Sequence, residues 1–449
     1  MKQLSLFPEE GEELENESID ICDWGTFKDS LKAPIHSWFT YPAGFSYKAV
    51  ESSITQYEIK PLEFIYDPFM GSGTTNVVAK KLGISSYGCD AHPFVFKIAQ
   101  TKLNWDIKLS DVSTAIKKLF ALIDETQNQL NGKVVLEDIF PELVLKCYES
   151  ENLFKLLLIR DSLFGSDISQ EMKQFLMVSL TYLLREVSTA ATGWPYIAPN
   201  KTKIKSSTKD VFSEFQIVTF KMVKDIELVI REAEESYFLA KHNLFNIDSR
   251  NTKEYIEDNS VDHIFTSPPY LNNYDYADRT RLEMYFFGYA KNWADITQKV
   301  RKKLMTSATT QTLRGDTRYI LSQKLQCYAP KIYNILDSAI EDLGKIRLTK
   351  GGKKNYDLVV AGYFNDIFEV LQDCYRVLKL GKKAIFVLGD SAPYGVYLPT
   401  DELIGELGIA VGFSSYKIDV LRTRGEKWKK NPQRHTEKLR ESIVTLTKE

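Results

Sequence analysis

Short apolar runs alternate along this chain with longer segments of helical periodicity. Two of the runs, 62–66 and 261–265, are of the kind that forms strands buried in a parallel sheet. A third run, 382–390, is predicted to finish the same sheet. Three longer segments repeat apolar residues at the spacing of amphipathic helices: 111–130, 168–187 and 212–236. The pattern predicts an α/β fold, a doubly wound sheet with a mostly helical inserted domain.

These elements also divide the chain. Residues 1–25 are predicted to be a disordered acidic tail. The sheet-bearing domain is expected in two pieces, 26–106 and 241–449, with the helical insertion at 107–240 between them. A second insertion, 291–355, is expected within the later piece.

The first apolar run leads into the string "DPFMGSGTTNVVAKKLG", which predicts a strand, a glycine turn and a helix. Gly71 and Gly73 let the backbone adopt positive φ and approach a ligand closely, and the threonines 74–75 can cap the helix. The turn is not a P-loop, because no Lys-Ser/Thr pair follows the glycines. It is also a poor dinucleotide fingerprint, because Asn76 stands where the third glycine belongs.

Asp90 closes the next predicted strand, 85–90, a little over twenty residues further on. An acidic residue in this place typically holds ribose hydroxyls. The glycine turn, Asp67 and Asp90 together indicate a nucleoside site that lacks a phosphate-binding motif. S-adenosylmethionine fits such a site, because it carries adenosine and an amino acid but no phosphate.

The second apolar run ends at Ser267-Pro268-Pro269-Tyr270. Two prolines stiffen the chain and remove two amide donors, so the nearby carbonyls are free to accept hydrogen bonds. A hydroxyl before the pair and an aromatic ring after it suit a planar base with an exocyclic amine. The same tetrapeptide also fits a proline-rich strand exit with a capping serine.

Several strings, in order, resemble the amino-group (N4-cytosine/N6-adenine) DNA methyltransferases. "DPFMGSGTT" is similar to that family's cofactor loop and "TSPPY" to its catalytic loop. "HSWFTYPAGFS" resembles the segment that covers the methionine end of the cofactor, and "NLFNIDSRN" the strand whose acidic residue reaches the adenine amino group. Residues 421–446 resemble the family's last hairpin.

The resemblance implies a Rossmann-like fold, S-adenosylmethionine as cofactor, double-stranded DNA as partner, and a target base flipped into the pocket. It implies a catalytic role for the tetrapeptide Ser267, Pro268, Pro269 and Tyr270. The cofactor-binding residues that it implies are His36, Tyr41, Phe45, Asp67, Phe69, Gly71, Ser72, Gly73, Thr74, Asp90 and Asp248. His36 fits equally well as an ordinary packed histidine.

Serine at position 267 favours N4-methylcytosine as product, because adenine enzymes of this family more often carry aspartate there. N6-methyladenine is the alternative. A methyltransferase of RNA or protein amides usually carries Asn-Pro-Pro-Tyr, and an inactive DNA-binding subunit would be expected to have lost part of these motifs. No cysteine follows a proline, which argues against carbon-5 cytosine methylation.

The net charge of −2 combines an acidic N-terminal segment with a basic remainder of the chain. Residues 1–20 carry seven acidic side chains and one lysine, a charge of −6, which leaves +4 for residues 21–449. Positive charge gathers in three segments that look like loops, 200–209, 298–303 and 422–440. Each can be a solvated face, but phosphate contacts are expected for at least one. The loop 193–209 in the helical insertion is the expected site of DNA recognition.

Five scattered cysteines indicate a reducing cytoplasm, and no His/Cys spacing predicts a metal. No apolar run is long enough to span a membrane.

Gln3–Phe7, "QLSLF", resembles the peptide by which bacterial proteins dock on the replication sliding clamp; it can equally pack on its own domain. A separately encoded restriction endonuclease is a further expected partner.

Overall fold

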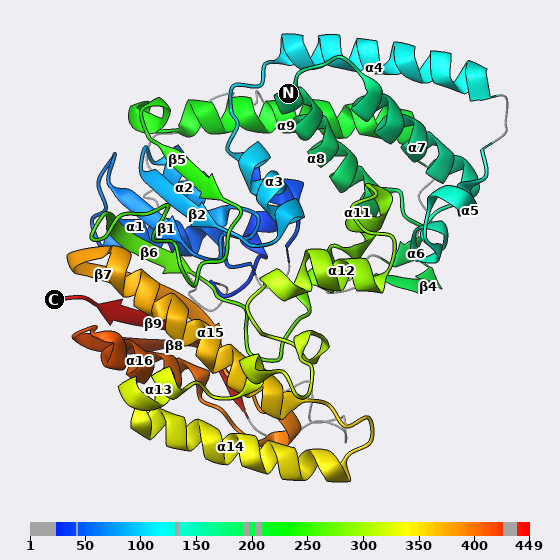
Figure 1. Cartoon of the computed structure of the whole chain (residues 1–449). Coiled ribbons are helices and arrows are strands. Elements are labelled where there is room, and N and C mark those ends of the chain that lie inside the picture. The colour runs from blue at the N-terminus through cyan, green and yellow to red at the C-terminus, as the bar shows by residue number, and fades with distance from the viewer. Residues whose placement is uncertain (1–23, 42–43, 131–133, 192–196, 203–208, 425–437) are drawn as a thin grey trace, which may run out of the picture.

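The computed structural model describes residues 24–41, 44–130, 134–191, 197–202, 209–424 and 438–449. Its centre is a seven-stranded sheet in the order β5-β2-β1-β6-β7-β9-β8 (Figure 1). The strands are β1 Phe64–Asp67, β2 Ser85–Cys89, β5 His242–Phe245, β6 Val261–Thr266, β7 Leu378–Gly389, β8 Ser415–Arg424 and β9 Leu439–Thr447.

One strand, β9, runs against the other six strands of this sheet. β5, β2, β1, β6 and β7 are parallel to their neighbours, whereas β9 is antiparallel to both β7 and β8. The chain moves outward from β1 through β2 to β5, then returns to place β6 on the other side of β1. Loops that follow β1 and β6 therefore leave the same sheet edge in opposite directions, which opens a crevice for a ligand.

Successive residues of the central strands face opposite sides of the sheet, as pleating requires. On one side Ile65 of β1 and Phe265 of β6 pack with helices α1 (Tyr47–Gln56) and α2 (Thr74–Lys81). On the other side Tyr66 and Ile264 pack with α15 (Tyr356–Val377) and α16 (Thr400–Val411). Helices on both faces of a mostly parallel sheet confirm the predicted α/β, Rossmann-like fold.

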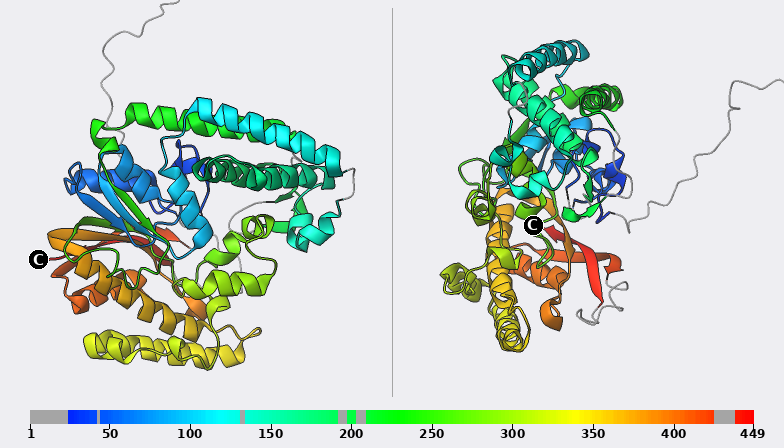
Figure 2. Two further views of the ribbon diagram at one scale, coloured as in Figure 1. Left: turned by 45° about the horizontal axis from the view of Figure 1, so that its top comes forward. Right: turned by 90° about the vertical axis from the view of Figure 1, so that its right-hand side faces the viewer.

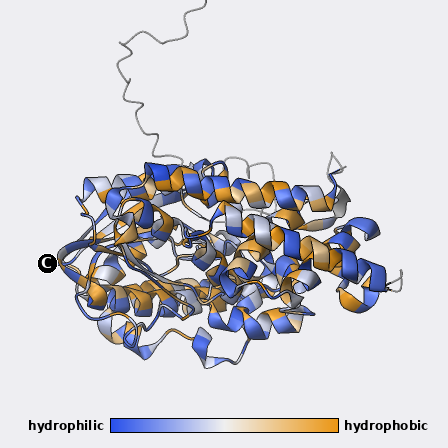
Figure 3. Ribbon diagram, turned by 90° about the horizontal axis from the view of Figure 1, so that it is seen from above, coloured by the Kyte–Doolittle hydropathy of each residue, from blue (hydrophilic) through white to orange (hydrophobic). Residues whose placement is uncertain are grey.

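A group of long helices extends from one end of the sheet, with α4 and α9 running alongside each other (Figure 2). Its helices are α4 Leu109–Leu130, α5 Leu136–Ile139, α6 Glu142–Leu145, α7 Ser150–Gly165, α8 Gln170–Glu186 and α9 Val211–Glu232. They carry hydrophobic and hydrophilic residues on different faces (Figure 3). Their apolar core is continuous with α3 (Pro93–Lys102) and with residues between Tyr276 and Val300, so it is joined to the sheet domain by packing.

The segment between β6 and β7 crosses to the opposite end of the molecule (Figure 1). It contains α10 Tyr276–Arg279, α11 Arg281–Phe286, α12 Trp293–Lys299, η5 Arg301–Lys303, η6 Thr309–Gln311, η7 Thr317–Tyr319, α13 Gln323–Tyr328 and α14 Pro330–Thr349. The remaining elements are η2 Asp29–Leu31, η3 His36–Trp38, β3 Ala190–Ala191, β4 Ala198–Thr202, η4 Glu235–Phe238 and η8 Pro393–Gly395.

Several predicted features lie outside the described residues. These are the clamp-like peptide Gln3–Phe7, nearly all of the acidic tail, most of the loop 193–209 and the central part of 422–440. No helix in the described part of the chain is long and apolar enough to cross a membrane.

Candidate active site

The glycine turn between β1 and α2 needs its glycines. Gly71 and Gly73 have φ of +51° and +84°, which other residues rarely adopt. A Cβ on Gly71 would lie 3.2 Å from the Tyr41 ring, so the turn passes directly beneath that side chain. The predicted threonine caps are wrong, because Gly73 itself is the N-cap residue of α2 and Thr75 hydrogen bonds elsewhere.

Asp67 at the end of β1 connects three elements. Its carboxylate accepts hydrogen bonds from Thr75 Oγ1 (2.8 Å), Thr266 Oγ1 (2.7 Å) and the Phe69 amide (3.0 Å). The side chain is fully buried, and this burial raises the pKa of Asp67 to about 6 despite the three donors. Asp67 therefore holds the glycine turn against the end of β6.

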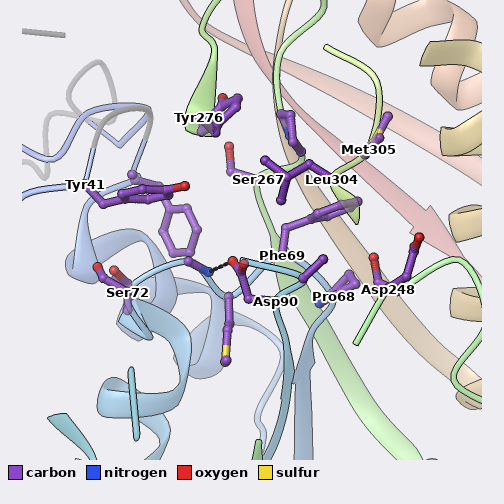
Figure 4. Close-up of a pocket in the computed structure, with 18 of the residues that line it drawn as sticks. Tyr41, Pro68, Phe69, Ser72, Asp90, Asp248, Ser267, Tyr276, Leu304 and Met305 are labelled. Atoms are coloured by element: carbon purple, nitrogen blue, oxygen red, sulfur yellow. Dashed lines mark hydrogen bonds between the residues drawn. The ribbon is translucent and has the colours of Figure 1, made fainter. Parts of the chain in front are cut away.

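Asp90 follows β2 and faces the same turn. Its Oδ2 accepts from the Gly71 amide at 3.0 Å, the bond drawn in Figure 4, and its Oδ1 accepts from the His92 amide at 2.7 Å. Burial raises the pKa of Asp90 to about 7. A carboxylate held in this way can accept the hydroxyl donors of a ribose.

The turn, Asp90 and the chain after β6 enclose one pocket (Figure 4). Ten of the predicted site residues line it: Tyr41, Phe45, Phe69, Gly71, Ser72, Thr74, Asp90, Asp248, Ser267 and Pro269. Apolar rings alternate there with carboxylates and a hydroxyl, which suits a nucleoside with a flat base. The structure thus brings together two motifs that lie nearly two hundred residues apart.

Five predicted site residues do not line the pocket: His36, Asp67, Gly73, Pro268 and Tyr270. His36 is buried and stacks on Tyr47 with ring centroids 5.1 Å apart. Burial, together with Lys102, lowers the pKa of His36 to about 3. It is a packed, neutral histidine in this arrangement.

Asp248 enters the pocket from the segment after β5. Arg250 donates to both of its oxygens, and the same guanidinium reaches Asp366 on α15 at 2.5 Å. The Asp248 side chain stays 39% exposed, so one edge of the carboxylate remains accessible. That edge can accept a hydrogen bond from an exocyclic amine.

The predicted catalytic tetrapeptide leaves the sheet directly after β6. Ser267 Oγ donates to the Val387 carbonyl of β7 at 3.1 Å, which leaves its lone pairs available as acceptors. Tyr270 is buried, and its hydroxyl donates to Glu441 Oε1 on β9 at 2.9 Å. The Arg424 guanidinium lies 5.4 Å from the centre of the Tyr270 ring.

Sequence reasoning missed nine lining residues and the partners of Tyr270. Five of the nine adjoin predicted site residues in the sequence: Gly44, Pro68, Met70, Ala91 and Ser249. Tyr276, Lys303, Leu304 and Met305 complete the pocket from the far side of the catalytic loop. No local pattern marks them. The basic run 298–303 that precedes Met305 was predicted to be loop-like, but it is mostly helical. It forms the end of α12 and the helix η5, and Arg301 is buried there against Asp275 at 2.8 Å.

The pocket can hold S-adenosylmethionine without a metal or a phosphate grip. Asp90 offers a carboxylate to a ribose, aromatic rings offer faces to an adenine, and no lysine follows the glycines of the turn. Within the described residues, no group of three or more acidic, histidine or cysteine side chains is placed to hold a metal ion.

Comparisons with known proteins agree with this geometry. A family model described as a DNA methylase matches residues 10–101. The chain is 27% identical to the type II methyltransferase M.BsoBI of Geobacillus stearothermophilus over 435 residues, which cover 89% of this chain and 82% of the relative. It is 25% identical to the type II methyltransferase M.AvaI of Nostoc sp., covering 89% and 83%, and 23% identical to M.MvaI of Kocuria varians, covering 95% and 92%. These matches support an amino-group DNA methyltransferase family for this chain, and type II enzymes of that family use S-adenosylmethionine as methyl donor.

Proposed function

We propose that this protein methylates the exocyclic N4 amine of a flipped cytosine at a specific DNA sequence, as the modification enzyme of a restriction–modification system. The observation that carries the proposal is the meeting of Asp90 and Ser267 in one pocket. Site specificity and the biological setting rest on the relatives, which are named as type II methyltransferases.

The cofactor would bind in the part of the pocket that lies beside the glycine turn. Asp90 would accept the ribose hydroxyls, because its carboxylate is already fixed by two backbone amides. Phe69 and Tyr41 would pack against the adenine and the rest of the cofactor. The open edge of Asp248 would accept the adenine amine, as the resemblance implies.

S-adenosylmethionine supplies a sulfonium-activated methyl group. The target amine is a poor nucleophile because its lone pair is delocalised into the ring. Ser267 Oγ donates to Val387, so its lone pairs can accept one amine hydrogen, and the Pro268 carbonyl can accept the other. Holding both hydrogens turns the nitrogen lone pair out of the ring plane and toward the methyl group. Attack of the lone pair on the methyl carbon would break the methyl–sulfur bond, and the methylated nitrogen would then lose one proton to water.

The base must leave the duplex to reach this pocket, at a cost of a few kcal/mol. Tyr270 is the predicted stacking surface for it. The ring is buried and does not line the pocket, and Arg424 lies over one of its faces, so the other face would have to be uncovered for a base to stack there. The hydrogen bond to Glu441 would keep that ring from turning.

N6-methyladenine is the second candidate product. The two amines have similar chemistry. Serine at position 267 favours cytosine. Methylation of RNA or protein amides, and an inactive DNA-binding subunit, are less well supported, since the cofactor pocket and the tetrapeptide are intact.

Expression in a host that lacks DNA methylation tests the proposal. Modification-sensitive sequencing of the genome should reveal one methylated sequence motif in cells with the wild-type protein and none with Ser267→Ala. Genomic DNA without any methylated motif, from cells that contain folded protein, would refute it. The sliding-clamp and endonuclease partners stay predictions, with Gln3–Phe7 outside the described residues.

A further inference from the structure

A second cavity of about 430 Å³ lies beside the cofactor pocket. Leu304 lines both, so the two spaces adjoin at that residue. The cavity is formed by η5, η7, the chain between them, and one face of α15. Its polar lining residues include Arg250, Arg301, Lys302, Gln311, Arg318, Ser322, Asn365, Asp366 and Glu369.

The walls of this cavity are fixed by hydrogen bonds to α15. Asp366 accepts from the Thr306 amide at 2.8 Å and from Arg250. Asn365 accepts from the Ser322 amide at 2.9 Å and donates to the Ile320 carbonyl at 2.7 Å. These bonds hold irregular backbone in place around an open space. Such rigidity is expected of a preformed binding site.

Arg301 supplies the most informative group on the wall. Its side chain is 1% exposed, its Nε donates to Asp275 at 2.8 Å, and its Nη1 donates to Thr297 Oγ1 at 2.9 Å. The guanidinium stacks 3.8 Å from the centre of the Trp293 ring. Nη2 is buried and has no hydrogen-bond partner among the described residues. A buried donor left unpaired is costly, so an acceptor from outside is expected.

The lining of the cavity offers several cationic hydrogen-bond donors to an acceptor. Four lining residues are cationic (Arg250, Arg301, Lys302 and Arg318) and two are acidic (Asp366 and Glu369). Three of the cations already pair with carboxylates: Arg250 with Asp248 and Asp366, Arg301 with Asp275, and Arg318 with Asp316. Lys302 is exposed, and Arg318 is 57% exposed in a surface pair with Asp316. Solvent weakens such a pair, so Arg318 can turn to a phosphate at little cost.

We propose that this cavity binds a phosphodiester group of the DNA strand that carries the flipped base. The inference rests on the proposed function, because a base seated next to Ser267 brings its own backbone to the neighbouring opening. Arg301 Nη2 would donate to a phosphate oxygen inside the cavity, and Lys302 and Arg318 would contact the phosphate at the mouth. Recognition of the strand is thereby placed in the second insertion, beside the site of chemistry.

Salt titrations of DNA binding test this assignment. Lys302→Gln and Arg318→Gln each remove one exposed charge, and Lys345→Gln on α14, 71% exposed and outside the cavity, is the matched control. Each cavity variant should reduce the slope of log Kd against log salt by about 0.9, the value for one lost phosphate contact. Lys345→Gln should keep the wild-type slope. Affinity for S-adenosylmethionine should not change in any of the three.

Duplexes with a single uncharged methylphosphonate near the target base locate the contact. One substitution should weaken binding by the wild-type protein at least about tenfold and weaken Arg318→Gln less, because that variant has already lost one of the three contacts. Arg301→Gln should show the same loss, and its folding is checked by thermal melting. Unchanged salt slopes in both Lys302→Gln and Arg318→Gln would overturn the assignment. It would also be overturned if, at every phosphate tested, the methylphosphonate weakened binding by the variants as much as it weakens binding by the wild-type protein. If the wild-type protein methylates no DNA, the proposed function fails. If the wild-type protein methylates DNA but the variants bind DNA with the wild-type salt slope and phosphate dependence, only this inference fails.

Discussion

The two sides of the pocket are built in different ways. The cofactor side consists of short turns that directly follow β1 and β2, and Asp90 reaches Gly71 across nineteen positions of sequence. The base side starts from Ser267–Tyr270 but depends on Glu441 and Arg424 of the C-terminal strands and on Leu304 of the second insertion. A cofactor shared by a whole family can be held by local motifs, whereas a target base and its DNA need distant segments. This difference predicts that mutations on the cofactor side weaken S-adenosylmethionine binding, whereas mutations on the base side lower turnover.

The largest expected effect is on the base side. Ser267→Ala removes an acceptor for the amine hydrogens, and turnover should fall by about 100-fold or more, as when one preorganised polar group is deleted from an active site. S-adenosylmethionine affinity, measured by calorimetry, should stay within about twofold. Ser113→Ala on α4, which removes an exposed hydroxyl, is the control. Full activity in Ser267→Ala would exclude the serine from the mechanism.

On the cofactor side, Asp90→Ala should weaken S-adenosylmethionine binding by about 10- to 100-fold, the worth of hydrogen bonds to a charged group. Turnover at saturating cofactor should fall much less than in Ser267→Ala. Asp124→Ala, an exposed aspartate on α4, controls for the loss of a carboxylate. Equal cofactor affinity in Asp90→Ala and wild type would remove the proposed ribose contact.

The pH dependence of cofactor affinity sharpens the same assignment. Burial raises the pKa of Asp90 to about 7 in the free protein, and ribose donors would favour the ionised carboxylate. Affinity should therefore be constant above pH 7 and fall by up to about tenfold for each unit below it. Asp90→Asn should flatten the profile. A wild-type profile that is flat from pH 8 to 6 would contradict the assignment.

A smaller effect is expected at Glu441. Glu441→Leu removes the acceptor of the Tyr270 hydroxyl, so turnover should drop by about five- to tenfold while cofactor affinity holds. Glu441→Gln keeps an acceptor and should recover most of the activity. If both variants lose activity equally, the carboxylate charge, rather than the hydrogen bond to Tyr270, is what matters.

The cofactor side and the sheet were the more predictable parts of the molecule. The runs that became β1 and β6 are short, apolar and followed by glycine or proline, so local signals suffice. β1 begins at Phe64 rather than Leu62, because Leu62 adopts a φ of +68° that no strand uses. This conformation depends on its surroundings and leaves no mark in hydropathy.

The base side was less predictable because tertiary contacts decide it. The arginine of the basic run looked solvated by composition, yet Asp275 and Trp293 bury Arg301. Glu441 looked like one charge among many in the last hairpin, and only the pairing of β9 with β7 brings it to Tyr270. His36 shows the reverse case, since a residue in a motif is packed on Tyr47 and does not line the pocket.

The central claim is that one pocket joins an S-adenosylmethionine site to an acceptor for a flipped base. The most direct measurement is mass spectrometry of nucleosides from duplex DNA incubated with purified protein and isotopically labelled S-adenosylmethionine. The account predicts labelled N4-methylcytosine with the wild-type protein and its loss with Ser267→Ala. Labelled N6-methyladenine without methylcytosine would contradict the assignment of the base, and no labelled nucleoside from a protein that binds the cofactor would contradict the claim itself.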